Sequence, residues 1–158
     1  MTADRDPLPP LPRPVRGVFV RHVMQTACPG DFAFVWLDAE PGPAGTGVEV
    51  VDDLPDTCPQ PDEPLPAEYR RAFATGVRDG MERLGNGGSP YAVRIVLRDA
   101  RWHEVDSNAR SFEAAGRYAA AEVLACVREG REPSTVGRGA RPDRPVPTMP
   151  GDRRPGNR

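Results

Sequence analysis

The spacing of apolar residues in the first third of the chain predicts three β-strands. Between residues 15 and 26 two sets of side chains alternate, which is the two-residue period of a strand. Residues 32–37 form a more uniformly apolar run, and residues 48–54 form a third strand-like run after a turn-rich connection at residues 38–47. We therefore expect this part of the chain to build a sheet.

Apolar residues at helical spacing predict a first helix that begins at Pro66, a residue suited to the first turn. The face that we expect to be buried consists of Tyr69, Phe73, Val77, Met81 and Leu84. Gly76 and Gly80 each cost about 1 kcal/mol relative to alanine in a helix interior. We expect close packing of this helix on the sheet to offset that cost, because a glycine leaves no side chain in the gap.

A fourth strand and a second helix complete the pattern. Residues 91–98 alternate in the manner of a strand, and Ser107 is a suitable N-cap for a helix that ends at Gly130. The apolar stripe of this helix consists of Phe112, Ala115, Ala119, Val123, Leu124 and Val127. The order of elements predicts an α+β fold in which two helices pack on one face of a four-stranded sheet.

The predicted folded domain covers residues 15–130 and lies between two tails. Residues 1–14 contain a proline-rich run typical of polyproline II, which we interpret as a stiff spacer. Residues 131–158 are dominated by arginine, proline and glycine and contain almost no apolar residue. Such a composition cannot build a core, so we expect this tail to be disordered.

The formal net charge of −2 conceals regions of opposite sign. Residues 128–158 hold eight arginines against four acidic residues, whereas the rest of the chain holds thirteen arginines against nineteen. Residues 49–68 carry seven acidic residues and no basic one. Apart from the two histidines every basic residue is arginine, so the chain has no lysine for Schiff-base chemistry or for a phosphate-binding loop.

Three cysteines, Cys28, Cys58 and Cys126, occur without a CxxC pair or a histidine cluster, so we expect no disulfide and no metal site. Cys126 falls on the apolar stripe of the second helix, where a buried thiol is expected. No apolar run approaches the roughly 18–20 residues of a membrane span, and the N-terminus is unlike a signal peptide. We expect a cytoplasmic protein without a cofactor.

The loop from Arg101 to Asn108, between the fourth strand and the second helix, is the best candidate for a binding site. Its histidine, His103, lies between Trp102 and Glu104 at an end of the predicted domain, and loops on a rigid scaffold often carry function. An imidazole beside an aromatic ring can hydrogen-bond phosphate or ribose and stack on a base. The chemistry of this loop is therefore compatible with a nucleic-acid contact, and the alternative is an exposed loop histidine without a role.

The remaining polar residues near this loop suggest structural roles. We expect Asp106 and Ser107 to cap the second helix, and His22, in the middle of the first strand, to be partly buried with its hydrogen bonds satisfied. The sequence shows no Ser/His/Asp grouping and no nucleophile elbow. We therefore assign no catalytic residue.

Three ordered segments carry motifs of one known family. Residues 21–26, Arg-His-Val-Met-Gln-Thr, are similar to the family pattern basic-His-x-x-Gln-Ser/Thr, and residues 66–77 are similar to Pro-x-Glu-Tyr-x-x-Ala-x-x-x-Gly-Ile/Val. Residues 91–127 add a strand, a His-Glu-Val-Asp-Ser loop and a helix rich in alanine. Together these segments, over about residues 16–127, resemble domain IV of bacterial elongation factor G.

This resemblance implies a fold shared with a domain of ribosomal protein S5, with a left-handed βαβ crossover, although parallel crossovers are otherwise right-handed. It also implies that His103 lies at a domain tip that reaches into the ribosomal decoding centre. The residues implied to contact RNA or the ribosome are Arg101, Trp102, His103 and Glu104 in one tip loop and Gly30 and Asp31 in the other.

The second tip loop departs from the family pattern, which is rich in glycine. Only Gly30 remains of those glycines, whose freedom lets the backbone approach RNA closely. Asp31 stands where the family has an amide, and its negative charge would repel phosphate.

We expect a stand-alone, non-catalytic module that binds the ribosome, at the RNA of the decoding centre or the A site, in a translation-related role. The sequence contains no GTPase domain and no phosphate-binding loop, so we expect no nucleotide binding and an action by occupancy. The alternative is a diverged protein-interaction domain that has lost RNA binding and contacts a protein partner through the acidic residues 49–68.

Overall fold

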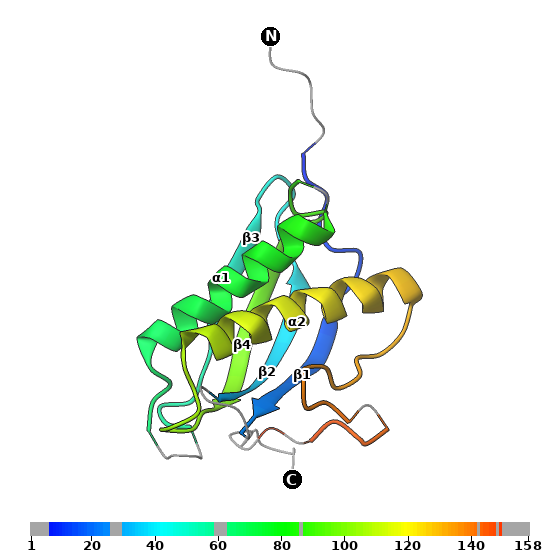
Figure 1. Ribbon diagram of the computed structural model, residues 1–158. Coiled ribbons are helices and arrows are strands. Elements are labelled where there is room, and N and C mark those ends of the chain that lie inside the picture. The colour runs from blue at the N-terminus through cyan, green and yellow to red at the C-terminus, as the bar shows by residue number, and fades with distance from the viewer. Residues whose placement is uncertain are drawn as a thin grey trace.

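A four-stranded sheet and two helices make up the protein, for which a computed structural model describes residues 7–25, 30–58, 63–85, 87–141, 143–147 and 149 (Figure 1). The elements in chain order are β1 (Val15–Met24), β2 (Asp31–Pro41), β3 (Val48–Asp52), α1 (Ala67–Leu84), β4 (Val93–Arg101) and α2 (Ala109–Glu129). The structure confirms the predicted α+β class, with the strands and helices in the predicted order.

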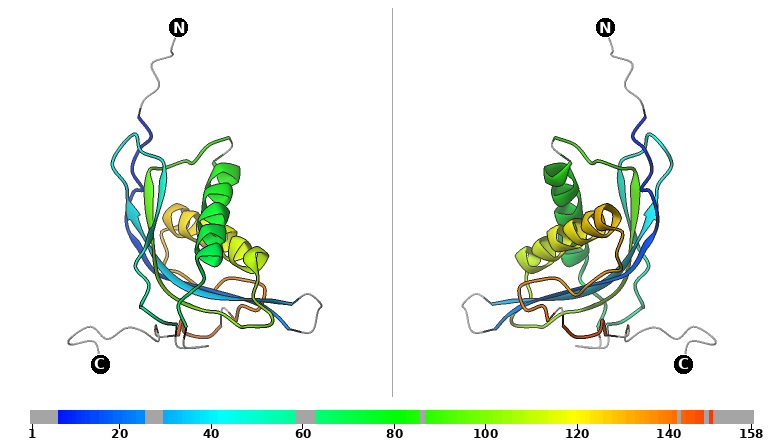
Figure 2. Two further views of the ribbon diagram at one scale, coloured as in Figure 1. Left: turned by 90° about the vertical axis from the view of Figure 1, so that its left-hand side faces the viewer. Right: turned by 90° about the vertical axis from the view of Figure 1, so that its right-hand side faces the viewer.

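The strands lie side by side in the order β1-β2-β4-β3. β2 pairs antiparallel with both β1 and β4, whereas β3 pairs parallel with β4, so α1 connects two parallel neighbours. Both helices cover the same face of the sheet (Figure 2). In Figure 1 the helices lie in front, β3 and β4 run downward, and β4 lies to the right of β3, which makes this crossover left-handed as the resemblance implied.

The core lies between the helices and the sheet. Val20, Val35 and Ile95, from three different strands, are fully buried in one hydrophobic cluster. Phe73 of α1 and Phe112 of α2 belong to the same cluster. The apolar faces predicted for the two helices therefore lie in the core, as the helical spacing indicated, except for Leu84. This residue, which we predicted to be buried, is 52% exposed at the end of α1.

We predicted that the glycines of α1 pack against the sheet, but they pack against α2. A Cβ atom on Gly76 would lie 1.9 Å from the carbonyl oxygen of Glu113, and one on Gly80 would lie 2.8 Å from the Ala120 methyl group. Across the same contact, a Cβ on Gly116 would lie 2.3 Å from the carbonyl oxygen of Phe73. The two helix backbones therefore cross in direct contact.

The described part of the segment before β1, residues 7–14, packs on the sheet, although we predicted a spacer. Leu11 is 2% exposed and belongs to the hydrophobic core cluster. Its N–H donates to the carbonyl oxygen of Ala92 at 3.0 Å, and the Ala92 N–H donates to that of Pro9 at 2.7 Å. In its described part this proline-rich segment thus continues the sheet at the start of β4.

Residues 131–147, here called the C-terminal arm, also differ in their described part from the predicted disorder. Val136 forms a bridge to Val20 of β1, and its carbonyl oxygen accepts from the Arg21 N–H at 2.7 Å. Further along, the carbonyl oxygen of Pro147 accepts from the Trp36 indole N–H at 3.0 Å. The arm has too few apolar residues to build a core of its own, and hydrogen bonds to the sheet hold it in place instead.

A buried carboxylate anchors the start of the C-terminal arm. Glu122 of α2 is 4% exposed, and its two oxygens accept from the guanidinium of Arg131 at 2.7 and 3.1 Å. The N–H of Ser134 donates to the same carboxylate at 2.8 Å. Burial alone would raise the pKa of Glu122, but these hydrogen bonds outweigh it, and the pKa lies below its ordinary value of 4.5.

Replacing Glu122 by glutamine should destabilise the protein in a pH-dependent manner. Because the folded-state pKa is lowered, the carboxylate stabilises the fold above its ordinary pKa, and this contribution is lost as pH falls through the lowered value. We expect Glu122→Gln to cost about 1–3 kcal/mol at pH 7 and clearly less at pH 3, in urea denaturation.

The exposed Glu113, on the same helix, provides the control through Glu113→Gln. Its side chain is 41% exposed and pairs with Arg117 at 3.3 Å, and exposed pairs contribute little to stability. An equal loss for Glu122→Gln at both pH values would contradict the assigned role of the carboxylate.

Both described cysteines are buried free thiols. Burial is the main cause that raises the pKa of Cys58 to about 11, and it likewise raises the pKa of Cys126 to about 11. Thiols of this kind are poor nucleophiles near neutral pH. Cys28 lies outside the described residues. In the part of the chain that the structure describes, no helix is long and apolar enough to cross a membrane.

Candidate nucleic-acid interface

The two predicted tip segments lie at one end of the sheet, where β4 leads into α2. The connecting loop 102–108 lies there beside the end of β1 and the start of β2. In Figure 1 this end is at the bottom, and the loop that joins α1 to β4 lies at the opposite end. The fold thus brings together residues that are about 75 positions apart in the chain.

Polar contacts tie the two segments to each other. The Gln25 amide donates to Asp106 Oδ2 at 3.0 Å, and the Asn108 amide donates to the carbonyl oxygen of Gly30 at 3.1 Å. A Cβ atom on Gly30 would lie 2.8 Å from Asp106 Oδ1 and 2.9 Å from the carbonyl oxygen of Met24, a backbone atom that cannot move aside as a side chain can, so this position favours glycine. Gly30 therefore serves the contact between the loops.

His103 is half-exposed, and the loop fixes its tautomer. Its side chain is 44% exposed, and Nδ1 accepts from the N–H groups of Val105 at 3.2 Å and Asp106 at 3.1 Å. A ring nitrogen that accepts hydrogen bonds carries no proton, so the neutral imidazole is protonated on Nε2. The ring is thereby oriented by its own loop and can donate through Nε2 to an external acceptor.

Ser107 connects the histidine loop to β2 and α1. Its hydroxyl donates to the carbonyl oxygen of Phe32 at 2.5 Å and accepts from the His103 N–H at 2.8 Å. The Tyr69 hydroxyl of α1 donates to the carbonyl oxygen of Ser107 at 3.1 Å. Burial, followed by the nearby Glu68 carboxylate, raises the pKa of Tyr69, so it remains a neutral donor.

The helix cap lies one residue later than we predicted. The Asn108 side chain, not that of Ser107, accepts from the Ser111 N–H at 3.0 Å and caps α2. Asp106, which we also expected to cap the helix, instead accepts from Gln25 and lies 3.5 Å from His103 Nδ1. Both residues therefore stabilise the loop and not the helix end.

The neighbours of His103 differ in their exposure. Trp102, which we predicted could stack on a base, is partly buried against the core, with its ring 6.0 Å from that of Tyr69 and nearly perpendicular to it. Arg101, also partly buried, holds its guanidinium 5.8 Å from the centre of the Trp36 ring. Glu104 is exposed, and Val105 is 82% exposed. The outermost residues of the loop are therefore Glu104 and Val105.

Asp31 is buried and paired, which corrects our expectation that its charge would repel phosphate. It is 8% exposed, and Oδ1 accepts from the Ser111 hydroxyl at 2.9 Å and from the Arg110 guanidinium at 3.2 Å. Oδ2 lies 3.8 Å from His22 Nε2. The carboxylate is thus neutralised inside the protein, by partners from α2 that lie far away in the sequence.

Two phenylalanines of β2, which the sequence analysis did not select, lie beside His103. The rings of Phe32 and Phe34 are stacked with centres 4.6 Å apart, and the Phe32 ring lies 5.8 Å from the imidazole. The Arg21 guanidinium lies 5.4 Å from the centre of the Phe34 ring. Both phenylalanines are only half-buried, so stacked rings, an oriented imidazole and an arginine line one surface.

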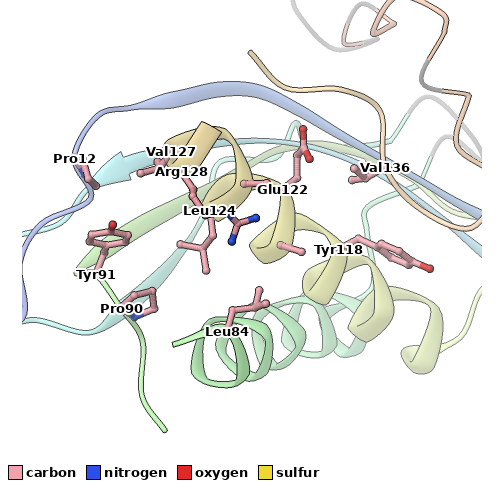
Figure 3. Close-up of a pocket in the computed structure, with 12 residues that line it drawn as sticks. Pro12, Leu84, Pro90, Tyr91, Tyr118, Glu122, Leu124, Val127, Arg128 and Val136 are labelled. Carbon is pink, nitrogen blue, oxygen red and sulfur yellow. The ribbon is translucent and has the colours of Figure 1, made fainter. Parts of the chain in front are cut away.

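A separate cavity of about 620 Å³ lies away from the predicted site residues, none of which lines it. Figure 3 shows Leu84 of α1, Leu124 of α2, and Tyr91 just before β4 around it. Its lining is mostly apolar and includes Val136 of the C-terminal arm. Among the described residues, no group of histidine, cysteine and acidic side chains could hold a metal ion.

Comparisons with known proteins agree with the fold. A family model described as elongation factor G, domain IV, matches residues 12–126. Among solved structures, a crystal structure of a protein from Thermus thermophilus is similar, with a TM-score of 0.56 and 20% sequence identity. That similarity covers 75% of this chain but 17% of the other, and at this identity it supports the fold alone.

Proposed function

The chain belongs to the elongation factor G domain IV family, and on that premise we propose that it is a non-catalytic module that binds ribosomal RNA at the decoding centre or the A site. The family is one of translation factors, and the match itself supports a role at that level. The finer role, binding to RNA through the tip loops, is our proposal. Such a role would place the protein in the cytoplasm.

The observation that carries this proposal is the orientation of His103. Two loop N–H groups hold Nδ1, so the half-exposed ring has its Nε2–H group for a phosphate or ribose oxygen. An acceptor on RNA meets a ring that is already oriented, so little side-chain entropy is lost on binding. The adjacent Phe32 and Phe34 rings add a surface on which a base can stack.

The tip carries charges of both signs. The Asp31 carboxylate is paired with Arg110, so its charge is balanced inside the protein. Asp106, which accepts from the neutral Gln25 amide, and the exposed Glu104 keep their negative charges, so a phosphate should bind on the side of His103 that faces Phe32. The Arg21 guanidinium lies over the Phe34 ring and also donates to the carbonyl oxygen of Gly139, which leaves its other N–H groups for RNA. We infer that one or two bases stack near Phe32 while His103 and Arg21 contact the backbone.

Co-sedimentation with ribosomes tests the proposal. We expect the wild-type protein to sediment with ribosomes at low salt, and log affinity to fall linearly with log salt, as for contacts to phosphate. His103→Ala should weaken binding by about tenfold or more, because it removes a hydrogen bond to a charged group. The measurement is the bound fraction over a salt series.

Thr46→Ala is the matched control for this experiment. Thr46 lies in the loop between β2 and β3, and its hydroxyl makes an exposed hydrogen bond to Pro43. The variant should bind as the wild type does, and thermal unfolding should show that both variants are folded. No sedimentation at low salt, or an equal effect of both substitutions, would overturn the proposal.

A second candidate function, a protein-interaction domain, is supported by the apolar cavity in Figure 3 more than by the acidic residues 49–68. In that acidic segment Asp52 and Asp53 form ion pairs with Arg70 and Arg98, which reduces its free charge. Ribosome-independent capture of a protein that survives nuclease and His103→Ala would favour this function.

A further inference from the structure

A second cavity, of about 390 Å³, lies between β1, the first half of α2 and the C-terminal arm. Its lining includes Arg110 and Arg117 of α2, Arg138 of the arm, His22, and a single acidic residue, Asp31. Three guanidinium groups therefore face one carboxylate. Such an excess of positive charge around a concave surface favours an anionic ligand.

The backbone of the C-terminal arm fixes Arg138 at this cavity. The neighbouring Gly137 has φ +118°, and a Cβ there would lie 2.3 Å from the carbonyl oxygen of Arg21. On the other side, the Gly139 N–H donates to the same carbonyl oxygen at 3.2 Å. Arg138 therefore lies between two glycines that are held against β1, and its position does not depend on its own side chain.

The charges of the three arginines are balanced to different degrees. Arg110 pairs with Asp31 at 3.2 Å, and Arg117 lies 3.3 Å from Glu113 and 3.9 Å from Asp79. Arg138, by contrast, forms no ion pair with any described residue. Arg110 lies in the first turn of α2, where the positive end of the helix dipole already disfavours a cation. The site thus holds one guanidinium group, that of Arg138, whose charge no described carboxylate balances through an ion pair.

His22 reports the same electrostatic environment. Its Nδ1 atom is buried and has no hydrogen-bond partner among the described residues, so our expectation of a satisfied histidine was wrong. Burial lowers the pKa of His22 most, Asp31 raises it, and Arg138, Arg110 and Arg117 each lower it further. All three guanidinium groups therefore act on a neutral imidazole at the wall of the cavity.

We propose that this cavity binds a phosphate group through Arg138, Arg117 and Arg110. Guanidinium groups match phosphate oxygens in geometry and charge, and three of them converge here from two elements. The phosphate can come from an RNA backbone or from a small phosphorylated molecule. The inference does not rest on the proposed function, because it involves other residues than the His103 loop.

Nuclear magnetic resonance with inorganic phosphate tests the proposal on the full chain. Phosphate should shift the amide signals of Gly137, Gly139 and Arg110 in a saturable manner. Arg138→Gln should raise the fitted Kd by about tenfold or more, because one charge-assisted contact is lost. Arg117→Gln should also raise it, and this variant leaves the C-terminal arm untouched.

Arg16→Gln is the matched control, since it removes one positive charge outside the cavity. Arg16 lies at the start of β1, and its side chain is 63% exposed. Arg16→Gln should leave the Kd for phosphate unchanged. Without phosphate, the Gly139 amide signal of Arg138→Gln should keep its wild-type chemical shift, which would show that the C-terminal arm stays in place. Absence of saturable shifts, or equal weakening by Arg138→Gln and Arg16→Gln, would refute the site.

Competition distinguishes the two sources of phosphate. Displacement of phosphate by a short single-stranded RNA without terminal phosphates identifies a backbone phosphodiester, and displacement by a nucleoside monophosphate alone identifies a small molecule. His103→Ala should not change the phosphate titration. If the wild-type protein binds phosphate but does not sediment with ribosomes, the proposed function fails and this site stands.

Discussion

Replacing Gly116 by alanine should lower the free energy of unfolding by about 3 kcal/mol or more, although alanine is the better helix former. A Cβ atom at this position would lie 2.3 Å from the carbonyl oxygen of Phe73 and 2.6 Å from the backbone nitrogen of Val77. Both atoms belong to the backbone of α1, which cannot move aside as a flexible side chain can. The helices would have to separate, and their packing on the sheet would loosen.

Two opposing effects make the sign of this result informative. Helix propensity alone predicts a gain of about 1 kcal/mol for alanine over glycine, whereas the backbone contact predicts a loss. Urea denaturation measures the difference, and Gly47→Ala is the control, because a Cβ at Gly47 would meet no atom within 4 Å. A Gly116→Ala protein as stable as the wild type would show that the helices do not cross as described.

The glycines of α1 show what a sequence pattern can and cannot predict about packing. Gly76 and Gly80 in an otherwise good helix predicted a close approach, and the structure has one. The pattern could not identify the partner, since a missing side chain favours any close neighbour equally. The partner is α2, whose own Gly116 lies among alanines. In such a stretch one more small residue does not mark a special contact.

The described parts of the two terminal segments differ from the predictions for another reason. Composition averages over a segment, but Leu11 and Val136 are single apolar residues that dock on the sheet through backbone hydrogen bonds. Such hydrogen bonds carry no sequence signature. The anchor of the C-terminal arm, the pairing of Glu122 with Arg131, consists of two charged residues that are ordinary on a surface.

At the tip, sequence predicted the local features and missed the long-range ones. His103 was recognised because its loop follows a clear strand and precedes a clear helix. The partner of Asp31 is Arg110, 79 residues later, so the pairing that buries this carboxylate could not be read from its neighbours. Phe32 and Phe34 fall in an apolar run that is typical of a fully buried strand. The sequence therefore contained no sign that both side chains are only half-buried.

Truncating Phe112 to alanine should lower the free energy of unfolding by about 3–5 kcal/mol. The side chain is fully buried in the core cluster, and its ring stacks on that of Tyr69 with centres 5.0 Å apart. Alanine would leave a cavity between the two helices and the sheet, which a close-packed interior cannot fill. Urea denaturation of both proteins measures this loss.

The same substitution should also loosen the His103 loop at the tip, because the Phe112 ring supports Tyr69, whose hydroxyl donates to the carbonyl oxygen of Ser107. Tyr69→Phe separates the two effects: it keeps the ring and should cost only about 1 kcal/mol, the net value of one hydrogen bond. Both variants should speed amide hydrogen exchange at His103, whose N–H donates to the Ser107 hydroxyl. If exchange there were unchanged in both variants, the core would not position the histidine, and its orientation would be a property of the loop alone.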